Sequence, residues 1–203
     1  MSARLVLASV WLPPWIVRRE LEGVERATVS ALERLLGGDG AAATPDARRK
    51  ETIAEGRRRM AVRHADLIAR LLDARGRDAA IAEARAALYA VGVLLGRDAR
   101  ARLRVRGRRR DLVRAAGVLY RVLGIRFRAE WTTTDTARVE IGRCALSREY
   151  SPDTCRVLSA ADAGVVAGLW PGAQLEFEER ITEGRPACVA RLALPATEGE
   201  EGA

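Results

Sequence analysis

The sequence is poor in the side chains that carry out most enzyme chemistry. Its 203 residues contain one histidine, one lysine and three cysteines. It has no glycine-rich phosphate loop, no G-x-S-x-G sequence and no C-x2-C spacing. These absences argue against a nucleotide-binding loop, a serine hydrolase and a preformed zinc site. If the chain catalyses a reaction, a cysteine thiolate is the leading candidate for its nucleophile.

Long hydrophobic runs are also lacking. The apolar stretch from Leu5 to Val17 is interrupted by Pro13 and Pro14, and it is shorter than the roughly 20 apolar residues that span a bilayer. A charged amphipathic segment follows it directly, where a signal peptide would have a cleavage site. An odd number of cysteines argues against a disulfide framework and agrees with a reducing compartment. We therefore expect a cytoplasmic protein with free thiols and no membrane partner.

Basic charge is abundant, and almost all of it is arginine. The net charge is +8, and 34 of the 35 basic residues are arginine. Twelve of them lie between Arg97 and Arg128, a segment that suits phosphate or carboxylate groups. Only Tyr120 and Phe127 supply aromatic rings there, and no helix-turn-helix or zinc-finger spacing accompanies them. We favour an arginine-biased proteome as the cause of the arginine excess and do not expect a nucleic-acid partner. The alternative, an interaction protein that binds nucleic acid through this segment, is a third hypothesis.

The first 124 residues have helical periodicity. Apolar residues recur at helical spacing over about 13–36, 46–74, 77–95 and 109–123, with a shorter stretch over 98–106. Prolines 13 and 14 suit the first turn of the first long helix, and we expect Trp11 and Trp15 to anchor that helix to the core. Asp46 is predicted to start the second helix. Gly96 and Gly124 are predicted to end the last two long helices.

From residue 125 the apolar period changes to two. The pattern predicts a hairpin over 125–144, a helix over 152–168 that begins with Ser151 and Pro152, and a second hairpin over 175–194. The predicted fold class is α+β, with N-terminal helices packed against a four-stranded antiparallel sheet whose two hairpins flank one helix. We divide the chain into a helical region (1–124), a cysteine-containing region of the same compact unit (125–195) and a disordered acidic tail (196–203).

The three cysteines lie at the ends of predicted elements. Cys144 closes a strand, Cys155 lies near the start of a helix, and Cys188 opens the last strand. A helix N-terminus favours an anion, so we expect a lowered pKa for Cys155. Ser159 and Asp162 follow it at helical spacing and lie along the same stripe. The pattern predicts a pocket shared by these side chains, although any one cysteine alone is equally typical of a small buried hydrophobe.

His64 falls on the apolar stripe of the predicted helix over 46–74. Such a histidine is either a core residue with a hydrogen-bond partner or a base or ligand that faces a cavity. Three thiolates with His64 as a fourth ligand would suit zinc, and a cysteine or histidine would suit a haem axial position, but no motif spacing supports either group. We expect no metal and no cofactor, with zinc or haem as the alternatives.

Several short runs in the last third of the chain resemble a known family. The runs are 144–155, 162–164, 168–172 and 183–188. They are similar to L-2-amino-thiazoline-4-carboxylic acid hydrolases and, more remotely, to 4-vinyl reductase ligand-binding domains, over about residues 138–194. The resemblance implies that Cys144, Cys155, Asp162 and Cys188 line one small-molecule site. It also implies an activity that opens a ring containing sulfur and nitrogen by adding water.

The leading hypothesis is a hydrolase that opens a C–N or C–S bond of a small heterocycle or amidine. Cys155 would be the nucleophile, and Asp162 would position water or bind a cationic ring nitrogen. A small-molecule substrate is the expected partner, and a homo-oligomer stays open. The alternative is a non-catalytic sensor module, similar to 4-vinyl reductase domains, that binds a small molecule, a metal or haem. The predicted substrate-binding side chains are Cys144, Cys188, Ser159, Arg148 and His64, with one of Arg126, Arg128 and Arg148 on a substrate carboxylate.

Overall fold

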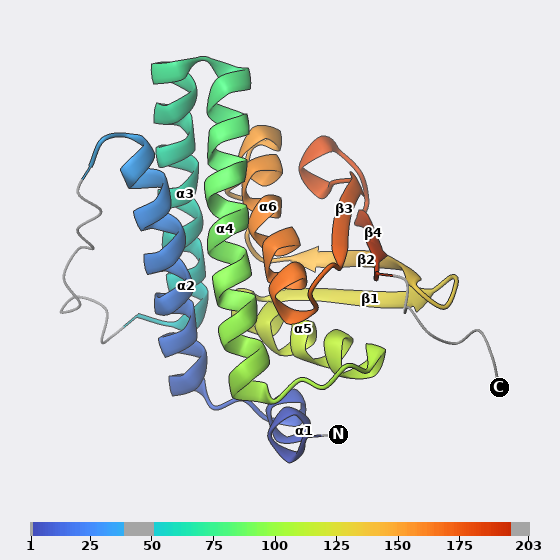
Figure 1. Ribbon diagram of the computed structural model, residues 1–203. Coiled ribbons are helices and arrows are strands. Elements are labelled where there is room, and N and C mark those ends of the chain that lie inside the picture. The colour runs from blue at the N-terminus through green and yellow to red at the C-terminus, as the bar shows by residue number, and fades with distance from the viewer. Residues whose placement is uncertain (1, 39–50, 196–203) are drawn as a thin grey trace.

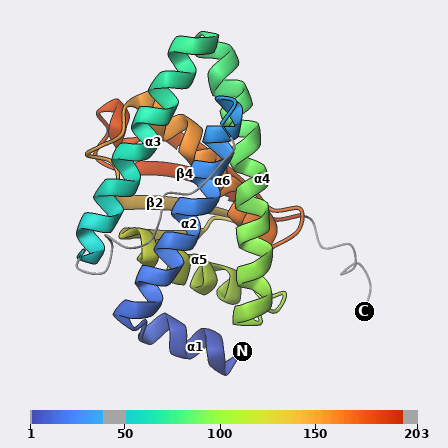
Figure 2. The same cartoon turned by 90° about the vertical axis from the view of Figure 1, so that its left-hand side faces the viewer.

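The computed structural model describes residues 2–38 and 51–195, which form helices packed against one face of a sheet (Figure 1). Helices α5 and α6 contact the sheet, and α4, α2 and α3 lie beyond α6 (Figure 2). The elements in chain order are α1 (Ala3–Val10), α2 (Pro14–Leu35), α3 (Ile53–Arg75), α4 (Arg77–Leu103), α5 (Arg109–Leu123), β1 (Ile125–Trp131), β2 (Thr136–Cys144), α6 (Pro152–Leu169), β3 (Gln174–Glu179), the 3-10 helix η2 (Ile181–Glu183) and β4 (Cys188–Ala193). The expected tail over 196–203 lies outside these residues, and the division at residue 124 stays a prediction.

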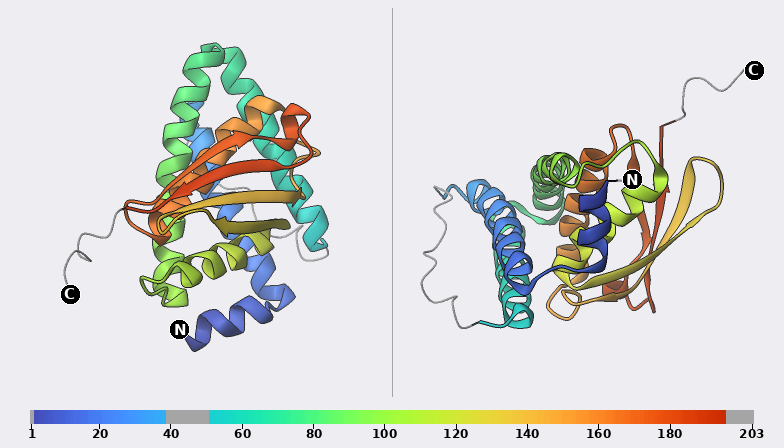
Figure 3. Two further views of the ribbon diagram at one scale, coloured as in Figure 1. Left: turned by 90° about the vertical axis from the view of Figure 1, so that its right-hand side faces the viewer. Right: turned by 90° about the horizontal axis from the view of Figure 1, so that it is seen from below.

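The sheet is antiparallel throughout, in the order β1-β2-β4-β3. Two hairpins flank α6 in sequence and join through the pairing of β2 with β4, so the predicted α+β class and the four-stranded arrangement are confirmed. Along β1, Ile125 is buried and Phe127 half-buried, whereas Arg126 and Arg128 are exposed. The alternation places the apolar side chains toward α5 and α6, and the opposite face of the sheet is seen without a covering helix (Figure 3, left).

Local signals set several element boundaries as expected. Ser151 accepts a hydrogen bond from the Thr154 amide at 3.1 Å, and Pro152 occupies the first turn of α6. Gly124 ends α5 in the left-handed region at φ 72°, which glycine adopts without steric cost. These predictions of the sequence are confirmed.

The start of α3 differs from the prediction. Asp46 lies outside the described residues, and the helix begins at Ile53. The Thr52 side chain accepts a hydrogen bond from the Glu55 amide at 3.2 Å, and the Glu55 carboxylate accepts one from the Thr52 amide at 2.7 Å. This capping box satisfies amide groups that a helix start leaves free, so it fixes the beginning of α3 seven residues after Asp46.

The end of α4 also differs, because Gly96 is a packing residue and not a cap. The helix runs through it to Leu103 and ends at Arg104, which has φ 53°. A Cβ atom on Gly96 would lie 2.3 Å from the carbonyl oxygen of Val165 in α6, and one on Gly92 would lie 2.1 Å from that of Ala161. Gly164 and Gly168 of α6 face α4 with equally short approaches. We call these four glycines the α4–α6 seam; here the two backbones touch.

The N-terminal segment contains a helix that the periodicity did not predict. Leu5 of α1 is fully buried, and α1 packs on α5. Trp11 and Trp15, expected to anchor the next helix, are instead 62% and 64% exposed. An apolar side chain can be buried, but its type does not show whether neighbouring residues will cover it; here the described residues leave most of each tryptophan side chain exposed.

Among the helices described, α4 is the one whose length and apolar composition would suffice to cross a membrane. In the structure it packs against α2, α3 and, through the seam, α6. These contacts place α4 within the helical layer of the fold, and the expected cytoplasmic location stays a prediction.

Candidate functional site

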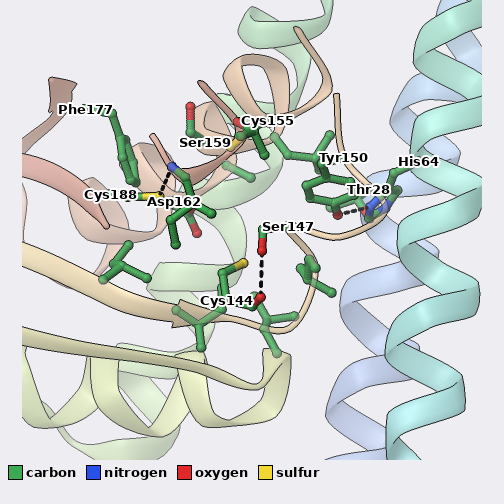
Figure 4. Close-up of a pocket in the computed structure, with 18 of the residues that line it drawn as sticks. Thr28, His64, Cys144, Ser147, Tyr150, Cys155, Ser159, Asp162, Phe177 and Cys188 are labelled. Atoms are coloured by element: carbon green, nitrogen blue, oxygen red, sulfur yellow. Dashed lines mark hydrogen bonds between the residues drawn. The ribbon is translucent and has the colours of Figure 1, made fainter. Parts of the chain in front are cut away.

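A cavity lies between α6, the inner face of the sheet and the helices α2 and α3 (Figure 4). Its volume is about 90 Å³. Its wall is mostly apolar, with a few polar groups and all three cysteines. The lining residues are Val24, Thr28, Met60, His64, Leu123, Ile125, Ile141, Cys144, Leu146, Ser147, Tyr150, Cys155, Leu158, Ser159, Ala161, Asp162, Phe177, Ile181, Thr182 and Cys188.

The three sulfur atoms reach this cavity from different elements. Cys144 ends β2, Cys155 lies in the first turns of α6, and Cys188 begins β4. All three thiols are free; Cys188 is buried, and the other two are half-buried. The sheet and helix therefore bring together residues that are 11 and 33 positions apart, as the predicted elements implied.

The thiols are less acidic than ordinary thiols, which corrects the expected pKa of Cys155. Burial raises the pKa of Cys155, and hydrogen bonding from Thr182 and the charge of Arg180 only oppose it in part. Burial likewise raises the pKa of Cys188, and it raises that of Cys144 to about 11. Loss of hydration in an apolar cavity outweighs the helix dipole here, so all three sulfurs are protonated thiols at neutral pH.

Asp162 is the acidic group of the cavity. Burial raises its pKa to about 7, and a hydrogen bond from the hydroxyl of Tyr120 opposes the rise. Burial in turn raises the pKa of Tyr120 well above its ordinary value, so the phenol stays protonated. Asp162 therefore changes between a neutral acid and a carboxylate close to neutral pH, on an otherwise uncharged wall.

His64 is held in one tautomer by its neighbours. Thr28 Oγ1 donates to the carbonyl oxygen of Val24 at 2.8 Å, so it accepts from His64 Nε2, also at 2.8 Å. Nδ1 is then the acceptor for the hydroxyl of Tyr150 at 3.0 Å. Burial lowers the pKa of His64 to about 4. Both ring nitrogens are engaged and the ring is neutral, so it links α2, α3 and the loop before α6 rather than serving as a free base.

One rim of the cavity is formed by η2 and the residues around it, which the sequence patterns did not single out. The guanidinium of Arg180 stacks over the Phe177 ring, 5.4 Å from its centroid, and donates to the Ser159 hydroxyl at 3.4 Å. Its side chain is 12% exposed. The available signal was that the alternation of Leu175 and Phe177 with glutamates ends before Arg-Ile-Thr-Glu (180–183), but an arginine near a turn is usually solvated. Thr28 and Tyr150 carried no signal, since their partner is distant along the chain.

The predicted arginines lie elsewhere. Arg148 is exposed and does not line the cavity, so the structure does not bring it to the other predicted site residues. Arg126 and Arg128 are exposed on β1 and line a separate groove. Among residues 2–38 and 51–195, no three His, Cys, Asp or Glu side chains are grouped so as to hold a metal ion. The expected lack of a cofactor stays a prediction.

Comparison with known proteins gives a fold but no sequence family. No family model matches the chain, and no curated protein sequence matches it either. A similar solved fold is the crystal structure of a trafficking protein particle complex subunit 3 from Naegleria fowleri covalently bound to palmitic acid. The TM-score is 0.52 at 12% sequence identity, over 71% of this chain and 98% of that chain.

This likeness corrects the interpretation drawn from the short runs in the last third of the chain. The fold is shared with a subunit of a protein complex, so the resemblance to thiazoline hydrolases and 4-vinyl reductase domains is wrong. The predictions of a hydrolase, of a small-molecule sensor and of a small-molecule substrate depended on that resemblance, and they are wrong as well. The site agrees with this correction, because both ring nitrogens of His64 are engaged in hydrogen bonds and the ring is not available as a base beside Cys155.

Proposed function

We propose that this chain is a subunit of a protein assembly and that its cavity takes an acyl chain attached through a thioester to Cys155. One observation carries the proposal: an apolar cavity has a half-buried free thiol on its wall, in a fold similar to that of a trafficking-complex subunit crystallised with covalently bound palmitic acid. An attached acyl chain is stabilised by burial of its methylene groups, each worth about 0.8 kcal/mol.

Cys155 is better suited to this attachment than the other two cysteines. The Sγ atom of buried Cys188 accepts a hydrogen bond from the Ile181 amide at 3.3 Å. Burial raises the pKa of Cys144 to about 11, so its thiolate is scarce at neutral pH. Cys155 is half-buried whereas Cys188 is buried; Arg180 favours the thiolates of both, and Thr182 hydrogen-bonds to that of Cys155. An arriving thioester carbonyl at this rim would also meet the guanidinium of Arg180.

The attachment is a transfer between thioesters. Cys155 loses its proton, and its sulfur attacks the carbonyl carbon of an acyl-coenzyme A. A new S–C bond forms, the bond to the coenzyme A sulfur breaks, and coenzyme A leaves as a thiol with the proton. No oxidation or reduction takes place. Because only the thiolate attacks and the pKa of Cys155 is raised, the rate should increase about tenfold per pH unit from pH 7 to pH 8.

The size of the cavity sets the chain length. Its 90 Å³ is less than the cavity of about 150 Å³ that binds benzene in another protein. A second apolar hollow of about 30 Å³ lies between α5, α6 and the sheet and shares Ile141 and Phe177 with the first. Any acyl chain therefore needs the first cavity to widen: a long chain also requires the Phe177 ring to move aside, whereas a medium chain requires less rearrangement.

The test is the intact mass of the purified protein after incubation with octanoyl- or palmitoyl-coenzyme A. We expect one hydroxylamine-sensitive acyl adduct, formed faster with octanoyl, and lost in Cys155→Ala. Phe177→Ala, which joins the two hollows, should raise the palmitoyl rate several-fold.

Cys144→Ala and Cys188→Ala are the matched controls, since each removes one other sulfur of the same cavity. Both should still be acylated once. An unchanged adduct in Cys155→Ala, or no adduct on the wild-type protein with either donor, would refute the proposal.

We further propose that the assembly is cytoplasmic. The proposal that this chain belongs to a protein assembly is supported by the fold alone. It predicts that the chain, isolated from its own cells with chemical crosslinking, is joined to a constant partner protein in fixed ratio. A protein recovered only as the free chain under those conditions would contradict it.

A further inference from the structure

An apolar corner is exposed where α1 meets α2. Leu7 is 64% exposed, Val10 77%, Trp11 62% and Trp15 64%. Leu7 and Val10 lie three residues apart on the outer side of α1, and the Trp11 amide donates to the Leu7 carbonyl at 2.9 Å. Four large apolar side chains within nine residues are thus exposed where α1 meets α2, a concentration that a soluble surface seldom leaves uncovered.

An arginine-walled groove adjoins this corner. It lies between α5 and the edge strand β1, has a volume of about 990 Å³ and reaches Ser9 of α1. The Arg121 guanidinium donates to the Ser9 carbonyl at 2.5 Å and so connects the groove to α1. The view from below shows α1, α5 and the edge of the sheet on one side of the molecule (Figure 3, right). The arginines of the wall are Arg114, Arg121, Arg126, Arg128 and Arg143.

The strand pairing compensates the positive charge of the groove only in part, since Arg128 lies opposite Glu140 but Arg126 has no acidic residue opposite it. Arg126 and Arg143 are directly opposite each other in the β1–β2 register, and both are exposed. Like charges at opposite positions of an antiparallel pair destabilise it. Glu140 is the one carboxylate of the groove wall, and it accepts a hydrogen bond from Arg138 at 2.7 Å. An anion bound between Arg126 and Arg143 would relieve this repulsion.

We propose that the α1–α2 corner and the arginine groove together bind the surface of an anionic lipid membrane. Indole rings favour the interface between headgroups and acyl chains, and aliphatic side chains beside them enter the acyl region. Arginines on the same side meet the anionic headgroups. The surface is independent of the cavity, so it does not rest on acylation of Cys155.

The alternatives account for fewer of these features. In a symmetric dimer through this surface, the same arginines of two copies would face each other and repel. Single-stranded nucleic acid binds where aromatic rings and basic groups alternate, but here the indoles lie at the corner and not along the groove. Apolar and basic groups placed side by side are typical of a membrane-binding surface.

The test is co-flotation of the full chain with vesicles of phosphatidylcholine alone or mixed with phosphatidylserine. We expect binding to the mixed vesicles and little to phosphatidylcholine, with loss of binding at about 1 M salt. Trp11→Ser with Trp15→Ser should weaken binding at least about tenfold. Arg126→Gln with Arg143→Gln should weaken it about fivefold for each arginine.

Leu94→Ser and Arg70→Gln are the controls, because they remove an exposed apolar and an exposed basic side chain from α4 and α3. Both should bind as the wild type does. Equal binding to both kinds of vesicle, unchanged binding in the two double variants, or a dimer that Trp11→Ser with Trp15→Ser converts to a monomer would each overturn the proposal.

Discussion

The two sides of α6 are packed in opposite ways. Toward α4 it presents Gly164 and Gly168, and the backbones of the two helices touch. Toward the sheet it presents Cys155, Ser159 and Asp162, and a cavity remains. The hollow is thus confined to one side of a helix whose other side has no space for a single methyl group.

This difference separates a structural contact from a functional one. The seam fixes the position of α6, so the cavity wall on the other side is held by a rigid support. An incidental packing defect would not collect three thiols, a carboxyl group and a histidine–tyrosine pair. We infer that the cavity is kept open for an occupant, which the proposed acyl chain would be.

The largest effect should come from adding a side chain to a glycine of the α4–α6 seam. A Cβ on Gly164 would lie 2.1 Å from the Tyr89 carbonyl oxygen, so Gly164→Ala must push the helices apart. We expect a loss of more than about 3 kcal/mol in the free energy of unfolding, measured with urea. Gly23→Ala is the matched control, because that helical glycine has open space; it should stabilise the protein by about 0.5–1 kcal/mol. Equal effects at both glycines would show that the seam is looser than described.

The second effect concerns His64, at the edge of the cavity. Its pKa is about 4 in the folded protein and about 6.5 when unfolded, so only the unfolded chain takes up a proton between these values. Stability should therefore fall by about 3 kcal/mol as the pH decreases from 6.5 to 4, and this contribution should be constant below pH 4. In His64→Gln the acid loss measured by urea unfolding should be smaller by that amount. Parallel pH profiles for the two proteins would contradict the buried neutral imidazole.

The third and smallest effect concerns Asp162 and has the opposite pH dependence. Its pKa is about 7 when folded and lies near 4 when unfolded, so the folded state holds a proton that the unfolded chain releases. Wild-type stability should fall between pH 4 and pH 7, whereas Asp162→Asn, which cannot ionise, should lack this fall. Since Asp162 is half-buried, the effect is reduced. We expect the free energy of unfolding of the variant, relative to that of the wild type, to be about 2 kcal/mol higher at pH 8 than at pH 4. The measurement is thermal unfolding of both proteins across this pH range. A difference in stability between wild type and variant that does not change with pH would rule out the raised pKa.

Much of the fold was predictable because its boundaries depend on local chemistry. Pro152 and Gly124 mark the elements they were expected to mark. Gly96 was misread because a glycine that ends a helix and one that admits a neighbouring backbone look alike in sequence. Trp11 and Trp15 were misread because an apolar side chain does not disclose whether anything covers it.

The candidate site was predictable in its location but not in its chemistry. Strand and helix ends implied that Cys144, Cys155 and Cys188 would meet, and they do. The expected acidity of Cys155 was wrong because desolvation, a property of the assembled cavity, exceeds the effect of the helix terminus. The hydrogen-bond partners of His64, Thr28 and Tyr150, come from two segments distant along the chain, and no local sequence pattern predicts them.

The most direct measurement is a crystal structure of the protein after incubation with octanoyl-coenzyme A. Our account predicts continuous density from the Sγ atom of Cys155 into the cavity beside Asp162 and Phe177. Density for an acyl group on another residue or on the surface, or an unmodified Cys155 beside an unchanged cavity, would contradict it.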